Sequence, residues 1–209
     1  MARAVTEIAF TPTVRARQIE EGSRESYEAF DHPDAPADDR LTGIEAAFIM
    51  DRDGFYQATV SETGWPYVQF RGGPKGFLKV LDEKTIAYAD YRGNRQYITS
   101  GNLRTNDRIS LILMDYPNRR RLKIWARASQ VEAKDDPALM SRLKMDGYRA
   151  LPERAMILTV EAIDWNCPQH IPRRFTIEEL EPQLTAMRAH IAELEAENAE
   201  LKDFLKPTA

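Results

Sequence analysis

Short segments with the composition of β-strands recur through the middle of the sequence, with little helical pattern between them. Each is rich in β-branched and aromatic residues, which are enriched in strands. The segments are Phe55–Val60, Tyr67–Arg71, Phe77–Leu81, Thr85–Tyr91, Ile109–Asp115, Leu122–Val131 and Met156–Trp165. Many short strands with few intervening helices predict a mainly β protein, either a barrel or a sandwich.

The beginning of this region carries two local signals. Thr42 precedes Glu45 by three residues, which is the spacing of a capping box, so we expect a short helix before the first strand. Turn residues at 61–64 separate the first two strand-like segments. This arrangement predicts an antiparallel hairpin.

The sequence on either side of the strand-like region has a different character. Residues 12–30 are rich in helix formers and charges, and the prolines that follow prevent a helix from continuing. The predicted organisation is an N-terminal helical arm at 1–40, a barrel domain at 41–165, a proline-rich linker at 166–175 and a C-terminal coiled-coil helix at 176–209.

The C-terminal segment has apolar residues at alternating steps of four and three, which is a heptad pattern. The series is Leu180, Leu184, Met187, Ile191, Leu194, Asn198, Leu201 and Leu205. Placing Asn198 at an a position favours a parallel two-stranded coil, because a buried polar a residue specifies register. Glu197 with Lys202, and His190 with Glu195, can then pair across a dimer. The alternative is a single amphipathic helix lying on the barrel.

Composition limits the classes of partner and location. The chain has a formal charge of −4, one cysteine and three histidines, so we expect a reducing cytoplasm, no disulfide framework and no metal site. The largely apolar run Ile109–Met114 is far shorter than the roughly 20 residues that span a bilayer. Arg173 and Arg174 are too few for binding a duplex. We therefore expect neither a membrane nor a nucleic acid as partner.

Positive charge is concentrated in one glycine-punctuated part of this acidic chain. The residues are Arg71, Lys75, Arg92, Arg95, Arg119, Arg120 and Arg121. A phosphate group requires such side chains together with backbone N–H groups, which glycine-rich turns bring close. The pattern predicts a site for a phosphate-bearing cofactor, with Arg95 as its strongest candidate. A solvated hairpin is the alternative for residues 119–121.

Three stretches, residues 64–71, 88–96 and 120–127, resemble the pyridoxamine 5'-phosphate oxidase-like family of FMN-binding split barrels. The resemblance extends over about residues 42–165. It implies an antiparallel, Greek-key split β-barrel with flanking helices that binds FMN at the interface of a homodimer. One departure is that the family's Ser-Arg-Lys phosphate turn reads Gly93-Asn94-Arg95 here.

The resemblance also implies roles for individual residues around the flavin. Gln69, Phe70 and Arg71 would form the strand at the flavin edge, and Tyr88 and Ala89 would lie near the ribityl chain. Asn94 and Arg95 would lie at the phosphate, with Gln96 as a further cofactor-binding residue. Arg121 or Lys75 would place a cation at the ring, and Trp165 and Gln169 would reach it from the other subunit.

The implied function is an FMN-dependent oxidoreductase that transfers a hydride through flavin N5, with a small-molecule substrate or NAD(P)H. A flavin-binding sensor or carrier without turnover and a dimeric scaffold without cofactor are the alternatives. For Cys167 and His170 we expect structural roles, because no acid is placed to orient His170 as an acid or base. The segment around them could equally be a stiff linker.

Overall fold

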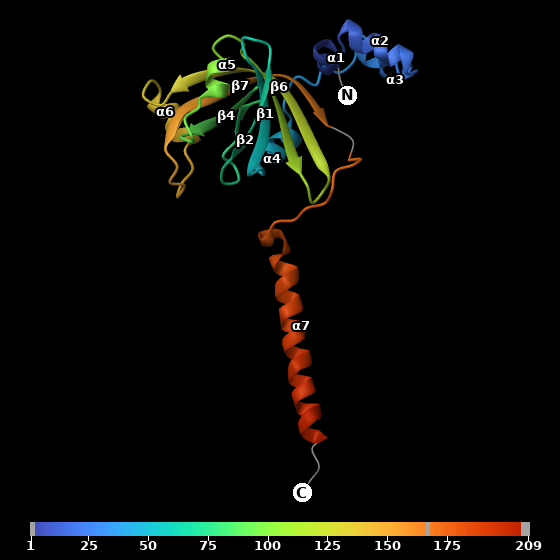
Figure 1. The fold of residues 1–209 in the computed structure, drawn as a ribbon, viewed down its shortest axis with the longest axis vertical. Coiled ribbons are helices and arrows are strands. Elements are labelled where there is room, and N and C mark those ends of the chain that lie inside the picture. The colour runs from blue at the N-terminus through green and yellow to red at the C-terminus, as the bar shows by residue number, and fades with distance from the viewer. Residues whose placement is uncertain (1–2, 166–167, 206–209) are drawn as a thin grey trace.

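The computed structural model describes residues 3–165 and 168–205 (Figure 1). Seven strands form one sheet in the order β2-β1-β5-β6-β7-β4-β3. Every pairing between neighbouring strands is antiparallel. The strands are β1 (Gly54–Val60), β2 (Pro66–Gly72), β3 (Lys79–Asp82), β4 (Thr85–Tyr91), β5 (Arg108–Asp115), β6 (Arg120–Glu132) and β7 (Pro152–Trp165).

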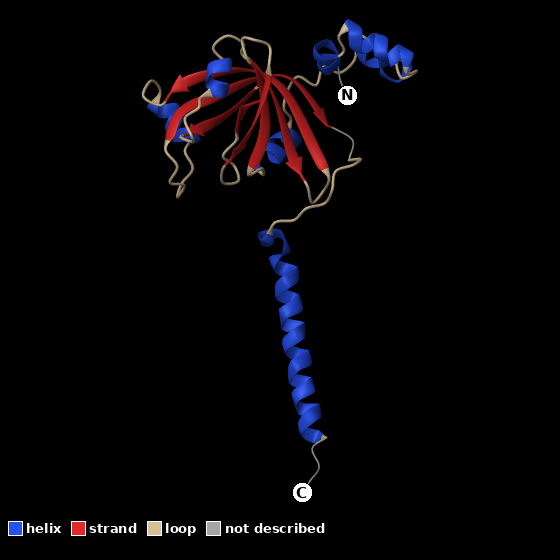
Figure 2. Ribbon diagram, in the orientation of Figure 1, coloured by secondary structure: helices blue, strands red, loops and turns tan. Residues whose placement is uncertain are grey.

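The sheet curls into a barrel that is not closed, a split barrel (Figure 2). Strands β1 and β4 are separated by β5, β6 and β7 in the sheet order, yet their side chains meet in the interior. The ring centroids of Phe55 and Tyr88 are 5.4 Å apart, and the Tyr88 hydroxyl donates to Gln57 Oε1 at 2.7 Å. The predicted mainly β, antiparallel split-barrel fold is therefore confirmed.

The alternation of side chains along the strands places the core. Every second residue is buried along β5 and over residues 122–128 of β6, including Leu111, Leu122 and Ile124. The predicted first hairpin is also confirmed, because Val60 pairs with Pro66 and Phe55 with Arg71. The strand predicted at Phe77–Leu81 begins at Lys79 instead. Phe77 and Leu78 lie in the loop before β3, where both are buried.

The helices are short, except for the last one. They are α1 (Arg3–Ala9), α2 (Pro12–Glu20), α3 (Glu25–Glu28), the 3₁₀ turn η1 (Ala29–Asp31), α4 (Gly43–Met50), α5 (Ile98–Asn102), α6 (Pro137–Leu143) and α7 (Ile177–Phe204). The N-terminal arm is docked at its first helix, because Ala4 and Val5 pack against Ala162 of β7. Within the described residues, no helix combines the length and apolar composition needed to cross a membrane.

The capping box before the first strand is present and has a second function. Glu45 accepts the backbone N–H of Thr42, and the Thr42 side chain caps the start of α4. The other carboxylate oxygen of Glu45 accepts the indole N–H of Trp165 at 2.6 Å. Trp165 also packs its ring edge-on against Phe48. Glu45 therefore ties α4 to the end of β7.

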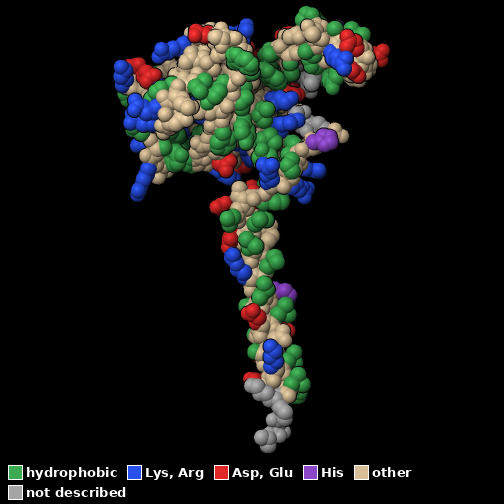
Figure 3. Space-filling view, in the orientation of Figure 1, with side chains coloured by type: hydrophobic (Ala, Val, Ile, Leu, Met, Phe, Trp, Pro, Cys, Tyr) green, Lys and Arg blue, Asp and Glu red, His purple; other side chains and the backbone are tan. Residues whose placement is uncertain are grey.

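Helix α7 projects away from the barrel (Figure 1). None of its described residues is buried, and hydrophobic side chains lie along its surface (Figure 3). The alternative in which this helix lies on the barrel is therefore wrong. Its N-terminus is nevertheless well formed, since Thr176 and Glu179 make a second capping box.

Candidate functional site

Strand β2 presents different chemistry on its two faces. Tyr67, Gln69 and Arg71 alternate with Val68 and Phe70, because successive side chains of a strand point to opposite faces. The first three line a cavity of about 240 Å³, whereas Val68 and Phe70 are more than half exposed, at 62% and 57%. The edge strand thus carries a polar face toward the cavity and an apolar face away from it.

The cavity lies between β2, the end of β4, the loop leading to α5 and the start of β7. Its lining is mostly polar and charged. The residues are Tyr67, Gln69, Arg71, Asp90, Tyr91, Gly93, Asn94, Arg95, Gln96, Tyr97, Ile98, Thr99, Ser100, Glu153 and Arg154. Such an arrangement suits a polar, anionic ligand better than an apolar one.

A buried ionic group forms the inner wall of the cavity. The Asp90 carboxylate lies 2.9 Å from Arg71 Nη1 and accepts Arg154 Nη1 at 2.8 Å. The pairing of Asp90 with Arg154 across β4 and β7 fixes this contact. Burial lowers the pKa of Arg154, but hydrogen bonds to Glu132 and Asp90 outweigh it and raise the pKa above its ordinary value. Arg154 is therefore held charged, and the Asp90 carboxylate fixes the positions of both arginines.

Several polar atoms of this wall are buried without a hydrogen-bond partner. They are Arg71 Nε, Asp90 Oδ1 and the Tyr91 hydroxyl. The contact between Asp90 and Arg71 is thus a charge pair without an aligned hydrogen bond at that oxygen. Buried polar groups are nearly always satisfied in proteins. Unsatisfied donors and acceptors in the cavity wall indicate a place for a ligand.

The loop between β4 and α5 forms the outer wall. Arg95 and Tyr97 have φ values of 62° and 54°, a left-handed conformation that non-glycine residues adopt rarely and mostly at functional sites. Arg95 Nε donates to the Tyr97 hydroxyl at 3.4 Å, and that hydroxyl donates to Glu153 at 3.2 Å. Among the described residues Arg95 makes no ion pair, so its guanidinium is available to an anion.

The pKa values around this loop follow from the same contacts. Hydrogen bonding to Tyr97, with the charges of Tyr97 and Glu153, raises the pKa of Arg95. The hydrogen bond from Arg92 to Glu153, at 3.0 Å, is the main cause that lowers the pKa of Glu153. Arg95 of the loop and Glu153 of β7 are therefore both charged at neutral pH.

The structure brings five of the predicted site residues to the cavity: Gln69, Arg71, Asn94, Arg95 and Gln96. Two more predicted site residues, Tyr88 and Ala89, are on β4 behind the cavity wall. Tyr88 is buried in the barrel core, where burial raises the pKa of its phenol, and Ala89 is buried on the other side of β4 against Leu143 of α6. Phe70 lies on the opposite face of β2, with its ring against Tyr56 at 5.3 Å.

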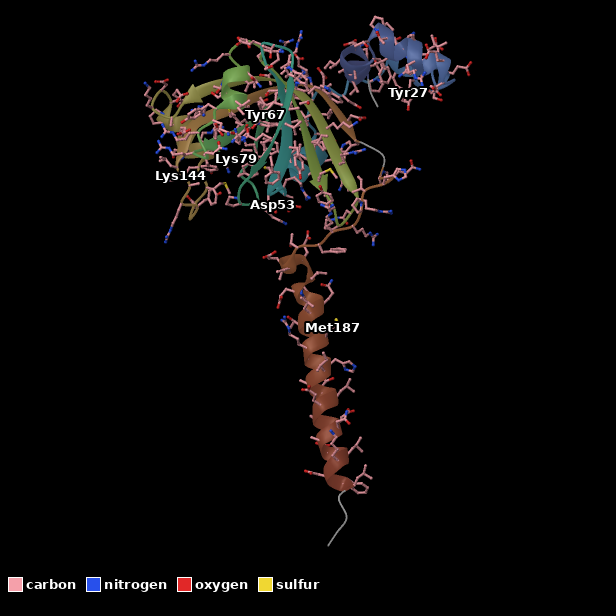
Figure 4. All side chains as sticks on the ribbon, in the orientation of Figure 1. Tyr27, Asp53, Tyr67, Lys79, Lys144 and Met187 are labelled. Atoms are coloured by element: carbon pink, nitrogen blue, oxygen red, sulfur yellow. The ribbon has the colours of Figure 1, made fainter. Side chains whose placement is uncertain are left out.

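The remaining predicted residues lie elsewhere in this chain. Lys75 pairs with Asp51 at 3.2 Å in a separate cleft, beside Asp53 at the end of the barrel that faces α7 (Figure 4). Arg121 does not line this cavity; it is half-buried on β6, where it alternates with the fully buried Leu122. Trp165 is held by Glu45, outside the cavity lining.

The segment after Trp165 is only partly described. Gln169 and His170 are exposed, and neither lines the cavity. Cys167, for which a structural role was expected, lies outside the described residues. No group of His, Cys, Asp and Glu within 3–165 and 168–205 could hold a metal ion.

Sequence reasoning missed several cavity residues. Asp90 had a signal, because it is an acid two positions after Tyr88 in an otherwise apolar strand. Thr99, which donates to Gln69 Oε1 at 2.9 Å, and Arg154 had none, because their places depend on strand pairing and on the loop conformation.

Comparisons with known proteins bear on the family and the fold. A family model described as Pyridoxamine 5'-phosphate oxidase matches residues 45–167. Among solved structures, HupZ from Group A Streptococcus is similar in fold, with 18% identity, a TM-score of 0.50, and 65% of this chain and all of that chain (100%) covered.

A second solved structure found in the comparison is an FMN-binding protein from Syntrophomonas wolfei. Its identity is 13% and its TM-score 0.47, with 74% of this chain and 95% of that chain covered. A search of curated proteins finds no match.

Proposed function

Because the chain belongs to the pyridoxamine 5'-phosphate oxidase family, we propose that the cavity beside β2 binds FMN and that the protein is an FMN-dependent oxidoreductase. The observation that carries this proposal is a pair of arginines with free donors in one cavity. Arg71 has a buried Nε without an acceptor, and Arg95 has no acid partner among the described residues. A phosphate is close to a dianion and needs such donors.

The residues present fit this cofactor. Arg95 and Asn94 would hold the phosphate, and Arg71 with Gln69 would face the flavin. Bound FMN supplies a hydride acceptor at N5, for a small organic substrate or NAD(P)H. The chain's own contribution is electrostatic, because Arg71 is held by Asp90 and can stabilise negative charge that develops beside it.

We propose further that a second copy of the chain completes the site. The cavity of about 240 Å³ is smaller than the roughly 300–1,000 Å³ usual for ligand sites. The other face of β2 and its neighbours exposes Tyr56, Val68, Phe70 and Ile112. A contiguous apolar patch of this kind marks an interaction surface.

Docking at this patch would give a homodimer with the flavin at its interface. Arg121, Trp165 and Gln169 would then contact the partner subunit's flavin, because none of them lines the cavity of its own chain. We also propose a cytoplasmic location, in which Cys167 would stay reduced. Cys167 has no catalytic role in this proposal.

The sharpest test compares two arginine variants of the full chain. Arg95→Ala removes a charged donor from the cavity, so its Kd for FMN should rise about 10-fold to 100-fold, the usual worth of a charge-assisted hydrogen bond. Arg108→Ala, an exposed arginine outside the cavity, should leave that Kd unchanged. Equal effects of the two substitutions on FMN affinity would refute the assignment.

Turnover is tested separately. Steady-state oxidation of NAD(P)H by the FMN-loaded protein distinguishes an oxidoreductase from a flavin-binding carrier, which would bind FMN with the same dependence on Arg95 but oxidise no donor.

A further inference from the structure

Helix α7 presents a complete heptad series that no described residue of the single chain buries. Leu180, Met187, Ile191, Leu194 and Leu201 are all exposed, with Met187 and Leu201 at 60%. Figure 4 shows Met187 on the projecting helix, away from the barrel. We propose that α7 pairs in parallel and in register with α7 of a second copy, as a two-stranded coiled coil. This inference does not depend on flavin binding.

Asn198 selects both the partner and the direction. In a parallel coil each a residue meets the same a residue of the other helix, so two Asn198 amides face each other and can hydrogen-bond. In an antiparallel coil an a residue meets a d residue, and every d residue of this series is Leu or Met. A parallel register shifted by one heptad would oppose Asn198 to Ile191 or Leu205. Only the in-register parallel pair satisfies the amide.

The flanking charges are complementary to a second copy in that arrangement. In a parallel dimer each g residue meets the e residue five positions later on the other helix. The three pairs are Gln183 with Arg188, His190 with Glu195 and Glu197 with Lys202. None opposes like charges. Within one helix Arg188 also contacts Glu181 at 2.9 Å. Both side chains lie at the edge of the apolar series, and neither covers it.

Pro182 is compatible with the coil. It lies inside α7, in the second turn of the helix, at an f position, which faces away from a coiled-coil seam. Its ring therefore removes one backbone hydrogen bond without entering the contact surface.

The test uses single cysteines in the full chain, with Cys167→Ser as background. Leu201→Cys places thiols at facing d positions of a parallel pair, within the Cα separation of about 4.4–6.8 Å that a disulfide requires. In the antiparallel arrangement Leu201 faces Leu184, seventeen residues away, so the two thiols would be about 25 Å apart. Asn198 remains in place in this variant.

Ala199→Cys is the matched control, because a b position faces away from the seam. On mild oxidation, Leu201→Cys should form covalent dimers on the order of tenfold or more faster than Ala199→Cys. Slow and equal cross-linking of the two variants, while the barrel remains folded by near-ultraviolet circular dichroism, would overturn the proposal whatever the outcome of the FMN experiments.

Discussion

The barrel and helix α7 use the same apolar residue types but differ in what covers them. In the barrel Leu122 and Ile124 are 0% exposed, because the curled sheet encloses its own inner face. In α7 Ile191 and Leu201 are 51% and 60% exposed. The difference teaches that a hydrophobic period defines a face, whereas only tertiary structure decides whether the same chain or another one covers that face.

Charge pairs give the strongest way to test this contrast. Asp90→Ala removes the buried acid that contacts both Arg154 and Arg71, and breaking a buried pair typically costs about 3–5 kcal/mol of unfolding free energy. Glu181→Ala breaks an exposed pair with Arg188 and should change the free energy of unfolding by no more than about 1 kcal/mol. Urea denaturation of both variants measures the difference. Comparable losses would mean that the Asp90 pair is not buried in solution.

The apolar residues give a second comparison. Leu122→Ala opens a cavity in the core and should reduce the free energy of unfolding by about 2–5 kcal/mol. Leu194→Ala removes the same atoms from α7, where no described residue of the single chain packs on them, so in protein dilute enough to be monomeric the barrel transition should not shift. Tryptophan fluorescence follows the barrel, because all three tryptophans precede α7. In monomeric protein, a barrel transition that moves with Leu194→Ala would show that α7 packs on the barrel.

The smallest expected effect concerns Glu45 and pH. Burial raises its pKa, but hydrogen bonds from Thr42 and Trp165 outweigh burial and lower the pKa below the ordinary 4.5. Because the folded pKa is the lower one, this carboxylate stabilises the fold above pH 4.5 and loses its contribution as pH falls through the folded pKa. Glu45→Gln should therefore flatten the fall of barrel stability below pH 4.5. If the fall of stability with pH is as steep in Glu45→Gln as in the unaltered protein, Glu45 does not cause it.

Local sequence patterns predicted what depends on neighbours along the chain. The capping box of Thr42 and the hairpin of β1 and β2 both follow from short-range chemistry, and both are present. Helix α6 also had a local signal that was overlooked, since Asp136 caps it and Pro137 begins it.

Predictions that depend on distant strands were weaker. The pairing of Asp90 with Arg154 requires the register of β4 against β7, which no local pattern encodes. Carrying over Gln69, Phe70 and Arg71 as one block ignored strand alternation, which separates Phe70 from its two neighbours. Arg95 and Tyr97 adopt a left-handed backbone conformation that shapes the cavity loop. Because neither position is a glycine, the sequence gives no local signal of that conformation.

The central claim is that this cavity holds FMN, and the absorption spectrum of the purified protein tests it most directly. We expect flavin bands in the near ultraviolet and the blue, with FMN identified by mass after denaturation. A colourless protein that also fails to bind added FMN would contradict the claim and leave a barrel whose cavity arginines serve another anion.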